Sequence, residues 1–347
     1  MIIIGCDLHT RCQQIAMLDT ATGEVVEKRL EHEDGEARRF YQGLEPPVLV
    51  GIESTGYTLW FAEMLSELGH ELVVGDAAKI RAAETRKQKH DRRDAGNILK
   101  LLAEGRFPRL WLPRVEEREV RVLLEHRHQL VQIRTRAKNG LQAIALNQGL
   151  RRRRRLWTEA GLKQLESLPV GEGTKRRRED LLHLMQQLDG WVGELDRRLK
   201  AEVERRPQAQ RLMTHPGVGP LTALATVLIL GEVERFAETR QVTSYVGLIP
   251  AEESSGGKQR FGHLTKQGSR LLRFLLVEAG QSASREDAGL SRVYKRLTFR
   301  KGKSIAKVAI ARKLIIRLYI MLRDQIDYQE FCRRGSHAGM LGDVALA

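Results

Sequence analysis

Short apolar runs alternate with amphipathic segments over the first 113 residues, and this alternation limits the fold more than any other feature of the chain. Three successive strands are predicted by apolar runs near residues 2–8, 12–18 and 24–30. Two helical patterns then alternate with two further strands, near residues 34–43, 48–53, 57–69 and 71–74. This order predicts an α/β domain built around one sheet.

Carboxylates stand at the ends of two of these strands and at the start of a later helix. Asp7 and Glu53 each close an apolar run, and an unpaired charge in mid-sheet would cost several kcal/mol. Asp91 and Asp94 are three residues apart at the start of a predicted helix, so they share one face. A solvated pair favoured by the helix dipole is the alternative for these two residues. Together, however, the four carboxylates are typical of a site that holds divalent cations against a phosphodiester.

The arrangement of strands and acids matches a ribonuclease-H-like sheet. In that fold the catalytic carboxylates come from the first strand, the fourth strand and a late helix, and the four acids occupy those elements. The cysteines do not suggest another metal site. The chain has three cysteines, Cys6, Cys12 and Cys332. An odd number of widely separated cysteines argues against a disulfide framework and fits a reducing compartment. Cys6, His9 and Cys12 lack a fourth ligand at zinc-like spacing.

The chain is strongly basic, with a net charge of +15 and an isoelectric point near 10.0. Such an excess predicts a polyanionic partner, and nucleic acid is the expected one. The apolar stretches fall short of the roughly 18 residues that would span a membrane. The amino-terminal isoleucine run is not preceded by the basic region of a secretory signal. We therefore expect a cytoplasmic, nucleoid-associated protein with no membrane partner.

Residues 114–206 are predicted to form a basic helical, coiled-coil region. They hold 22 Lys and Arg against 14 Asp and Glu, so 22 − 14 = +8. The charge is clustered in the run Arg151, Arg152, Arg153, Arg154, Arg155 and in Lys175, Arg176, Arg177, Arg178. Clustered charge favours phosphate binding. The alternative is a solvated antiparallel hairpin that the basic residues only keep soluble.

Two patterns stand out after residue 207. His215-Pro216-Gly217-Val218-Gly219 enters an apolar helix and resembles a helix-hairpin-helix turn, in which the amides at Gly217 and Gly219 would grip a phosphate. A plain interhelical turn is the alternative. Further on, Ser254-Ser255-Gly256-Gly257 forms a turn that could expose a hydroxyl group. A serine becomes a nucleophile only with help in losing its proton or in stabilising charge, and the nearby cations are Lys258, Arg260, Lys266 and Arg270.

These segments, in this order, resemble the DEDD transposases of the bacterial insertion-sequence one-ten family, which are similar to Piv-type invertases and include bridge-RNA-guided recombinases. The resemblance covers nearly the whole chain, through Gly5–His9, Gly51–Gly56, Asp91–Ala95, Ser254–Gly257 and Thr265–Gly268. It implies a RuvC-like domain with the acidic tetrad Asp7, Glu53, Asp91 and Asp94, which would bind Mg²⁺ or Mn²⁺. It also implies a catalytic serine, which matches Ser255, with Ser254 as the adjacent rival.

The resemblance further implies partners and an order of domains. The partners would be donor and target double-stranded DNA, a noncoding bridge RNA, and further copies of the chain in a dimer or tetramer with composite active sites. The expected segments are a RuvC-like catalytic domain (1–113), the basic helical region (114–206), a mostly α C-terminal transposase domain with the serine loop (207–330) and a tail (331–347).

The expected reaction is transposition by strand exchange through a serine–DNA intermediate. A RuvC-type endonuclease or junction resolvase without a covalent intermediate, and a noncatalytic nucleic-acid-binding scaffold, are the alternatives. The predicted nucleic-acid contacts are Arg92, Arg93, the two basic clusters, Gly217, Gly219 and the four cations of the serine loop.

Overall fold

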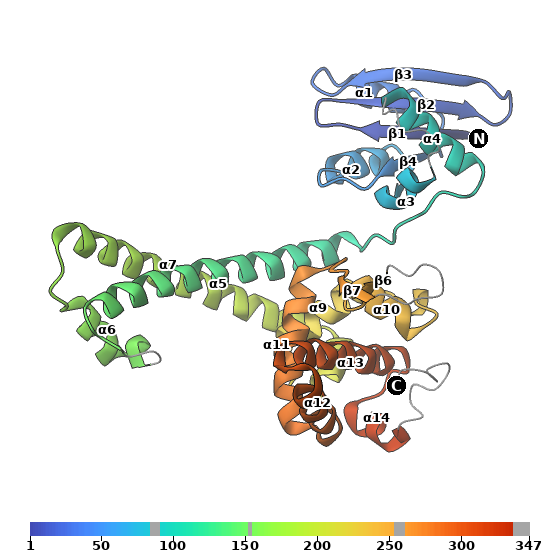
Figure 1. Cartoon of the computed structure of the whole chain (residues 1–347). Helices are drawn as coiled ribbons and strands as arrows, with labels where there is room; N and C mark the ends of the chain where they lie inside the picture. The colour runs from blue at the N-terminus through green and yellow to red at the C-terminus, as the bar shows by residue number, and fades with distance from the viewer. Residues whose placement is uncertain (84–90, 152–154, 253–260, 336–347) are drawn as a thin grey trace. The chain divides into compact units, whose positions relative to one another are not determined.

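The computed structural model describes residues 1–83, 91–151, 155–252 and 261–335. The side chains of Asp91, Arg92 and Phe261 also lie outside this description. The chain divides into two compact units, Met1–Leu112 and Pro113–Ala347 (Figure 1). Each unit has a hydrophobic core of its own.

The first unit is built on a five-stranded mixed sheet with the order β3-β2-β1-β4-β5. The strands are β1 (Ile2–Leu8), β2 (Cys12–Asp19), β3 (Val25–Glu31), β4 (Leu49–Glu53) and β5 (Glu71–Gly75). The first three form an antiparallel meander, whereas β4 runs parallel to β1 and β5 runs parallel to β4. The predicted α/β layout is confirmed, strand by strand.

Helices cover both faces of this sheet because the apolar side chains of the central strands alternate. Ile4 and Ile52 point to one face, where they pack with Tyr41 of α1 (Glu36–Gln42) and Phe61 of α2 (Leu59–Glu67). Ile3 points to the other face and packs against α4 (Asp91–Ala103). A short helix that the periodicity did not predict, α3 (Ala77–Ala82), lies on this second face and begins where the Asp76 carboxylate accepts from two backbone amides.

The second unit starts with two 33-residue helices, α5 (Val115–Asn147) and α7 (Glu172–Glu204), which pack along each other as a long hairpin (Figure 1). Leu130, Leu188 and Leu195 form part of the seam. Ion pairs cross it, with Arg127 on Asp196 at 2.8 Å and Arg134 on Asp189 at 2.7 Å. Near the far end of the hairpin, η1 (Arg155–Trp157) and α6 (Glu159–Glu166) fold onto it.

The rest of the second unit is a mostly helical module. Its elements are α8 (Pro207–Met213), α9 (Pro220–Leu230), η2 (Val233–Arg235), α10 (Thr239–Val246), β6 (Pro250–Glu252), β7 (Phe261–Leu264), α11 (Arg270–Glu286), α12 (Ala288–Lys301), α13 (Lys303–Arg323) and α14 (Tyr328–Arg334). Helices α9 and α13 together supply nearly half of the buried core residues, and the residues that they contribute are almost all aliphatic. No helix in the described ranges has both the length and the apolarity needed to cross a membrane.

The segment predicted to be a tail begins inside α14. The Tyr328 ring packs 4.6 Å from the His215 ring, and its hydroxyl donates to Asp287. Arg317 donates to the same carboxylate at 2.7 Å. These contacts hold α14 against the turn before α9 and the junction between α11 and α12.

Candidate active site

Two glycines that face each other across β1 and β4 bring α4 into direct contact with the sheet. Gly5 and Gly51 are register partners in the parallel pair. A Cβ atom on Gly5 would lie 2.3 Å from the backbone oxygen of Ala95, and one on Gly51 would lie 2.6 Å from a methyl group of Leu102. Any larger residue would push α4 away, so this pair fixes the height of the helix above the sheet.

Three of the predicted acidic residues lie next to this contact between α4 and the sheet. Asp7 and Glu53 each lie two residues beyond one of the glycines, so they point to the same face as the glycines do. The last register pair is Cys6 with Ile52, which puts Asp7 and Glu53 beside each other at the carboxyl ends of two parallel strands. Asp94 lies in the first turns of α4, directly before Ala95. Three of the four predicted acids therefore come from elements that meet at one edge of the sheet.

Asp7 and Glu53 already have polar partners. Nε2 of His9 lies 3.1 Å from a carboxylate oxygen of Asp7, and the Arg81 guanidinium donates to Glu53 at 2.9 Å. Their side chains are only partly exposed, at 20% for Asp7 and 28% for Glu53. Sequence reasoning missed both partners, although His9 stands two residues after Asp7 on the chain.

The donor chemistry of this edge fits a hard cation. Carboxylate oxygens are the ligands that Mg²⁺ and Mn²⁺ prefer, and these carboxylates are half-buried, so their charges are screened less than those of surface acids. Among the side chains that the structure describes, no three His, Cys, Asp or Glu residues are grouped closely enough to hold a metal ion. The Asp91 side chain, the fourth member of the predicted tetrad, lies outside the described atoms.

The serine segment connects two strands of the second unit. β6 and β7 pair antiparallel, with Pro250 opposite Leu264. The residues that join them, 253–260, lie outside the described residues, and with them Ser254, Ser255, Lys258 and Arg260. The predicted nucleophile therefore belongs to the connection of a two-stranded ribbon.

The base of this ribbon is held by two turns that interlock. A Cβ atom on Gly268 would lie 2.0 Å from the Tyr245 carbonyl oxygen, and one on Gly247 would lie 2.2 Å from the Gln267 carbonyl oxygen. Both glycines have positive φ, at 72° and 71° for Gly247 and Gly268, which no larger residue adopts without strain. Arg273 then donates to carbonyl groups of both turns, among them Val246 at 3.0 Å and Gly268 at 3.1 Å.

Two of the four cations predicted near the serine fall in the described residues. Lys266 and Arg270 are both exposed. Lys266 has a φ of 53°, a left-handed conformation that is uncommon for a residue other than glycine. Such backbone strain is concentrated at functional positions.

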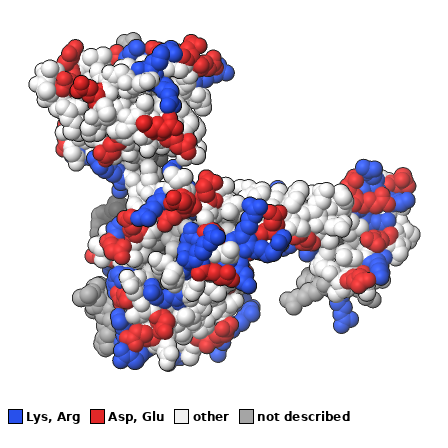
Figure 2. Space-filling model, turned by 180° about the vertical axis from the view of Figure 1, so that it is seen from behind, with Lys and Arg blue, Asp and Glu red and all other residues white. Residues whose placement is uncertain are grey.

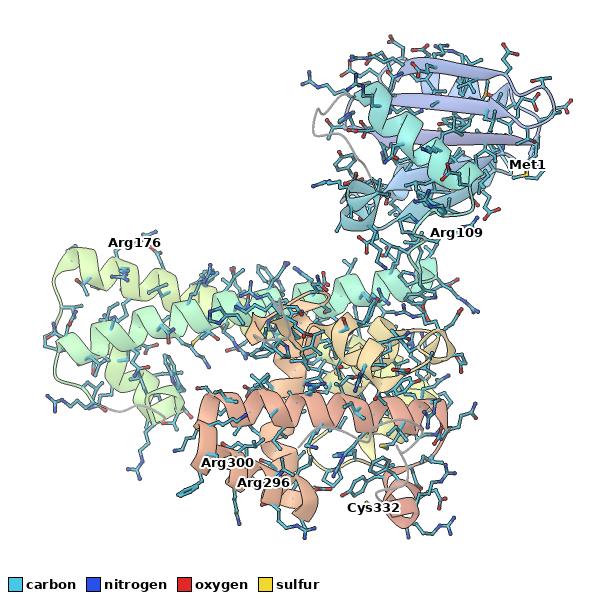
Figure 3. The ribbon with its side chains drawn as sticks, turned by 45° about the vertical axis from the view of Figure 1, so that its right-hand side comes forward. Met1, Arg109, Arg176, Arg296, Arg300 and Cys332 are labelled. Atoms are coloured by element: carbon cyan, nitrogen blue, oxygen red, sulfur yellow. The ribbon has the colours of Figure 1, made fainter. Side chains whose placement is uncertain are left out.

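The basic clusters of the hairpin divide into exposed and buried members. Arg151, Lys175 and Arg177 are exposed, and so is Arg176 (Figure 3), whose guanidinium lies 3.1 Å from the Asp180 carboxylate. Arg155 is exposed as well, whereas Arg152, Arg153 and Arg154 lie outside the described residues. In the first unit the Arg93 side chain is exposed.

The prediction that Arg178 contacts nucleic acid as part of this basic run is wrong. Its side chain is 5% exposed, and its guanidinium donates to the carbonyl oxygens of Leu165 and Leu168. These carbonyl groups lie at the end of α6, where the helix itself supplies few donors. Arg178 therefore joins α6 to α7 and is not available to a nucleic acid.

The glycine-rich turn between α8 and α9 is explained in part by packing. A Cβ atom on Gly217 would lie 2.3 Å from the backbone nitrogen of Ala283 in α11. Gly217 is therefore a packing residue, as expected of an interhelical turn. Gly219 differs, because it is exposed, precedes the first residue of α9, and has no other part of the described chain packed within 4 Å of its Cβ position. Of the two glycines, only Gly219 remains a candidate for the predicted contact with a phosphate.

Comparison with known proteins finds transposases along most of the chain. Residues 4–148 match the DEDD transposase family of IS110, described as Transposase, and residues 209–295 match a family described as Transposase IS116/IS110/IS902 family. The first match spans the sheet, α4 and α5, and the second runs from α8 into α12 and includes β6 and β7.

Whole proteins show the same similarity. The transposase for insertion sequence element IS1111A of Coxiella burnetii is 31% identical over 254 residues, which cover 70% of this chain and 69% of that protein. A protein of Pseudomonas aeruginosa named "Probable family 20 transposase" is 28% identical over 340 residues, which cover 94% of this chain and 98% of that protein. The transposase for insertion sequence element IS1328 of Yersinia enterocolitica is 29% identical over 241 residues, or 68% and 71% of the two chains.

Proposed function

Because the chain belongs to the IS110 family of DEDD transposases, we propose that it exchanges DNA strands through a covalent serine–DNA intermediate. The first unit would supply the carboxylates Asp7, Glu53, Asp91 and Asp94, and the second unit would supply Ser255. The regions assigned to these roles are residues 1–113 for the carboxylates, 114–206 for nucleic-acid binding and 207–330 for the serine.

One observation carries the proposal: Asp7 and Glu53 lie side by side at the carboxyl ends of β1 and β4, under a helix that bears Asp94. A sheet of order β3-β2-β1-β4-β5 with an antiparallel meander and two parallel strands supports a RuvC-like, ribonuclease-H-type assignment for this unit. In such a unit a carboxylate edge serves phosphodiester chemistry.

The cation would be Mg²⁺ or Mn²⁺, and when bound by the four carboxylates it would polarise a DNA phosphate and stabilise its developing charge. The Ser255 hydroxyl would then attack the phosphorus atom. A bond forms between the serine oxygen and phosphorus, the bond to one strand end breaks, and the departing oxygen takes up a proton while the serine loses one. Attack by the hydroxyl group of another strand end would reverse these changes, reseal the backbone and free the serine.

The position of the two groups on separate units supports a composite site. If the carboxylates of one copy act with the serine of another, the active form is a dimer or a tetramer. We further infer that a noncoding bridge RNA selects donor and target DNA. The exposed cations of the α5–α7 hairpin would then contact RNA backbone rather than bases.

The covalent intermediate gives the decisive experiment. The protein is incubated with Mg²⁺ and a DNA substrate whose cleaved end diffuses away, and the products are separated under denaturing conditions. The wild type and Ser254→Ala should give a protein–DNA adduct, whereas Ser255→Ala and Asp7→Asn should give none. Cleaved DNA without an adduct would indicate a RuvC-type nuclease instead, and binding without cleavage would indicate a scaffold.

Guidance by RNA is tested separately. The purified protein should carry a discrete RNA, and removal of that RNA by ribonuclease should abolish strand exchange until the RNA is added back. Exchange at an undiminished rate on RNA-free protein would contradict this part of the proposal.

A further inference from the structure

The most one-sided charge in the chain lies outside the predicted basic clusters. From Ala288 to Arg323, which spans α12 and α13, there are 11 Lys and Arg and no Asp or Glu, so 11 − 0 = +11. The α5–α7 region carries a smaller excess, because its 22 basic residues are offset by 14 acidic ones. By charge alone, helices α12 and α13 are therefore the strongest candidates for an additional polyanion contact.

The outer face of α12 gathers much of this charge around one aromatic ring. Arg292, Arg296 and Phe299 follow one another at intervals of four and three residues, so they align in a stripe along one side of α12. Lys303, the first residue of α13, follows directly after the end of this helix. All four are exposed. Figure 3 shows Arg296 and Arg300 projecting from this end of the module into solvent.

Phe299 is the one apolar residue in this stripe, and it is unusually exposed. Its side chain is 94% exposed, more than any other large apolar residue of the described chain. Phe274, by comparison, is 47% exposed and has a ring contact with His128. Burying a phenylalanine side chain stabilises a fold by about 1.5–3 kcal/mol, so a ring left in water contributes nothing of this to the fold.

The cations around Phe299 are not used within the fold either. Arg292, Arg296, Arg300, Lys301 and Lys303 form none of the ion pairs found among the described residues. Elsewhere in the same unit, arginines such as Arg127, Arg134 and Arg317 are paired with aspartates. The stripe thus combines positive charge that the fold does not use with an unpacked ring.

We propose that this α12–α13 surface, formed by Arg292, Arg296, Phe299, Arg300, Lys301 and Lys303, binds a single-stranded or opened segment of nucleic acid. The cations lie on the backbone phosphates, and Phe299 stacks on an unpaired base. The inference rests on the proposed function for the choice of nucleic acid over an anionic lipid surface. It adds a contact that needs neither the carboxylates nor Ser255.

The test measures binding without chemistry, in EDTA, by the fluorescence anisotropy of labelled 20-nucleotide oligothymidine, the matching oligouridine and a 20-base-pair DNA duplex. Base–aromatic stacking is worth a factor of about 5 to 150 in affinity. Phe299→Ala should weaken binding of one or both single strands by a factor in that range and change binding of the duplex by less than twofold. Phe299→Trp should restore the affinity, and Phe299→Leu should not.

The contribution of the cations is measured separately, through the salt dependence of binding. The double variant Arg296→Gln/Arg300→Gln should reduce the dependence of log affinity on log salt by about 0.7 for each single-strand phosphate that the protein no longer neutralises. Phe299→Ala should leave that salt dependence unchanged. Arg38→Gln in α1, which removes an exposed ion pair with Glu67, is the matched control and should change neither quantity.

Three results would overturn the proposal. Phe299→Ala could bind both single strands within twofold of the wild type. It could lose affinity only for vesicles that contain anionic lipid, or it could change only the sedimentation of the protein, which would identify a membrane or a second copy as the occupant. Because no strand is cut in this assay, its outcome is independent of whether the serine adduct forms.

Discussion

Replacing Gly5 by alanine tests whether the contact between α4 and the sheet sets the geometry of the carboxylates. The new Cβ atom would meet the backbone oxygen of Ala95 and the backbone nitrogen of Leu99, both at 2.3 Å, and the Leu99 Cα at 2.9 Å. All three are backbone atoms, so no side-chain rotation relieves the clash. The helix must therefore move away from β1 by about 1 Å to reach ordinary van der Waals contact.

The cost has two parts. Overpacking of this kind destabilises a protein by about 1–3 kcal/mol, which for a unit of about 110 residues lowers the melting temperature by about 4 °C per kcal/mol. The second part is chemical, because Asp94 is adjacent to Ala95 and moves with it, whereas Asp7 stays on β1. A misplacement of about 1 Å costs about 100-fold in rate, so we expect adduct formation to slow by that factor even where the protein remains folded.

Gly96→Ala is the control, since Gly96 lies on the same helix and no other part of the described chain packs within 4 Å of its Cβ position. Removing a glycine from a helix interior should stabilise the fold by about 0.5–1 kcal/mol and leave adduct formation unchanged. Melting is followed by circular dichroism, and the rate is measured about 15 °C or more below each transition, where few molecules are unfolded. If Gly5→Ala melts lower but cleaves at the wild-type rate, the inferred coupling between helix height and the carboxylates is wrong.

Two further predictions concern the second unit. Arg178→Met should destabilise this unit by about 2–3 kcal/mol, because two carbonyl groups lose their charged donor. Arg176→Met, the control, should cost less than about 0.5 kcal/mol. Equal losses of stability for the two variants in thermal denaturation would contradict this prediction. Burial lowers the pKa of His215 from 6.5 to about 4, so the unfolded chain binds the proton first. Stability should fall by about 3 kcal/mol between pH 6.5 and 4, and His215→Gln should flatten that dependence in urea titrations.

The strands of the first unit could be predicted because each is short and bounded by turn residues, and because β1, β4 and β5 are largely apolar. The placement of Asp7 and Glu53 followed directly, since a carboxylate that ends a buried run has to lie at the edge of the sheet. The glycines that precede them were also readable as a repeated pattern, Gly-x-Asp and Gly-x-Glu. The role of these two glycines depends on where α4 packs, and hydrophobic periodicity does not predict that tertiary contact.

Arg178 shows how a basic run misleads. Four consecutive cations predict a single phosphate-binding cluster, yet an α-helix turns by 100° per residue, so the members of a run face different directions. Arg178 is spaced from Leu181, Leu182 and Met185 as residues of the buried face are. Helical phase would have separated it from Arg176. Phe299 shows the same point from the other side, since its spacing from Arg292 and Arg296 places its ring on the charged face of the helix.

Charge is divided unequally between the two units, and this division bears on how the enzyme acts. Residues 1–112 carry 15 Lys and Arg against 18 Asp and Glu, so 15 − 18 = −3, and the remaining residues carry 44 against 26, or +18. Figure 2 shows acidic and basic side chains mixed on the face of the first unit. The unit that bears the carboxylates therefore has little electrostatic attraction for DNA of its own. Under the proposed mechanism, binding by the second unit would bring the phosphodiester to the carboxylates, and the cations of the hairpin and of the proposed α12–α13 surface would control when cleavage is possible.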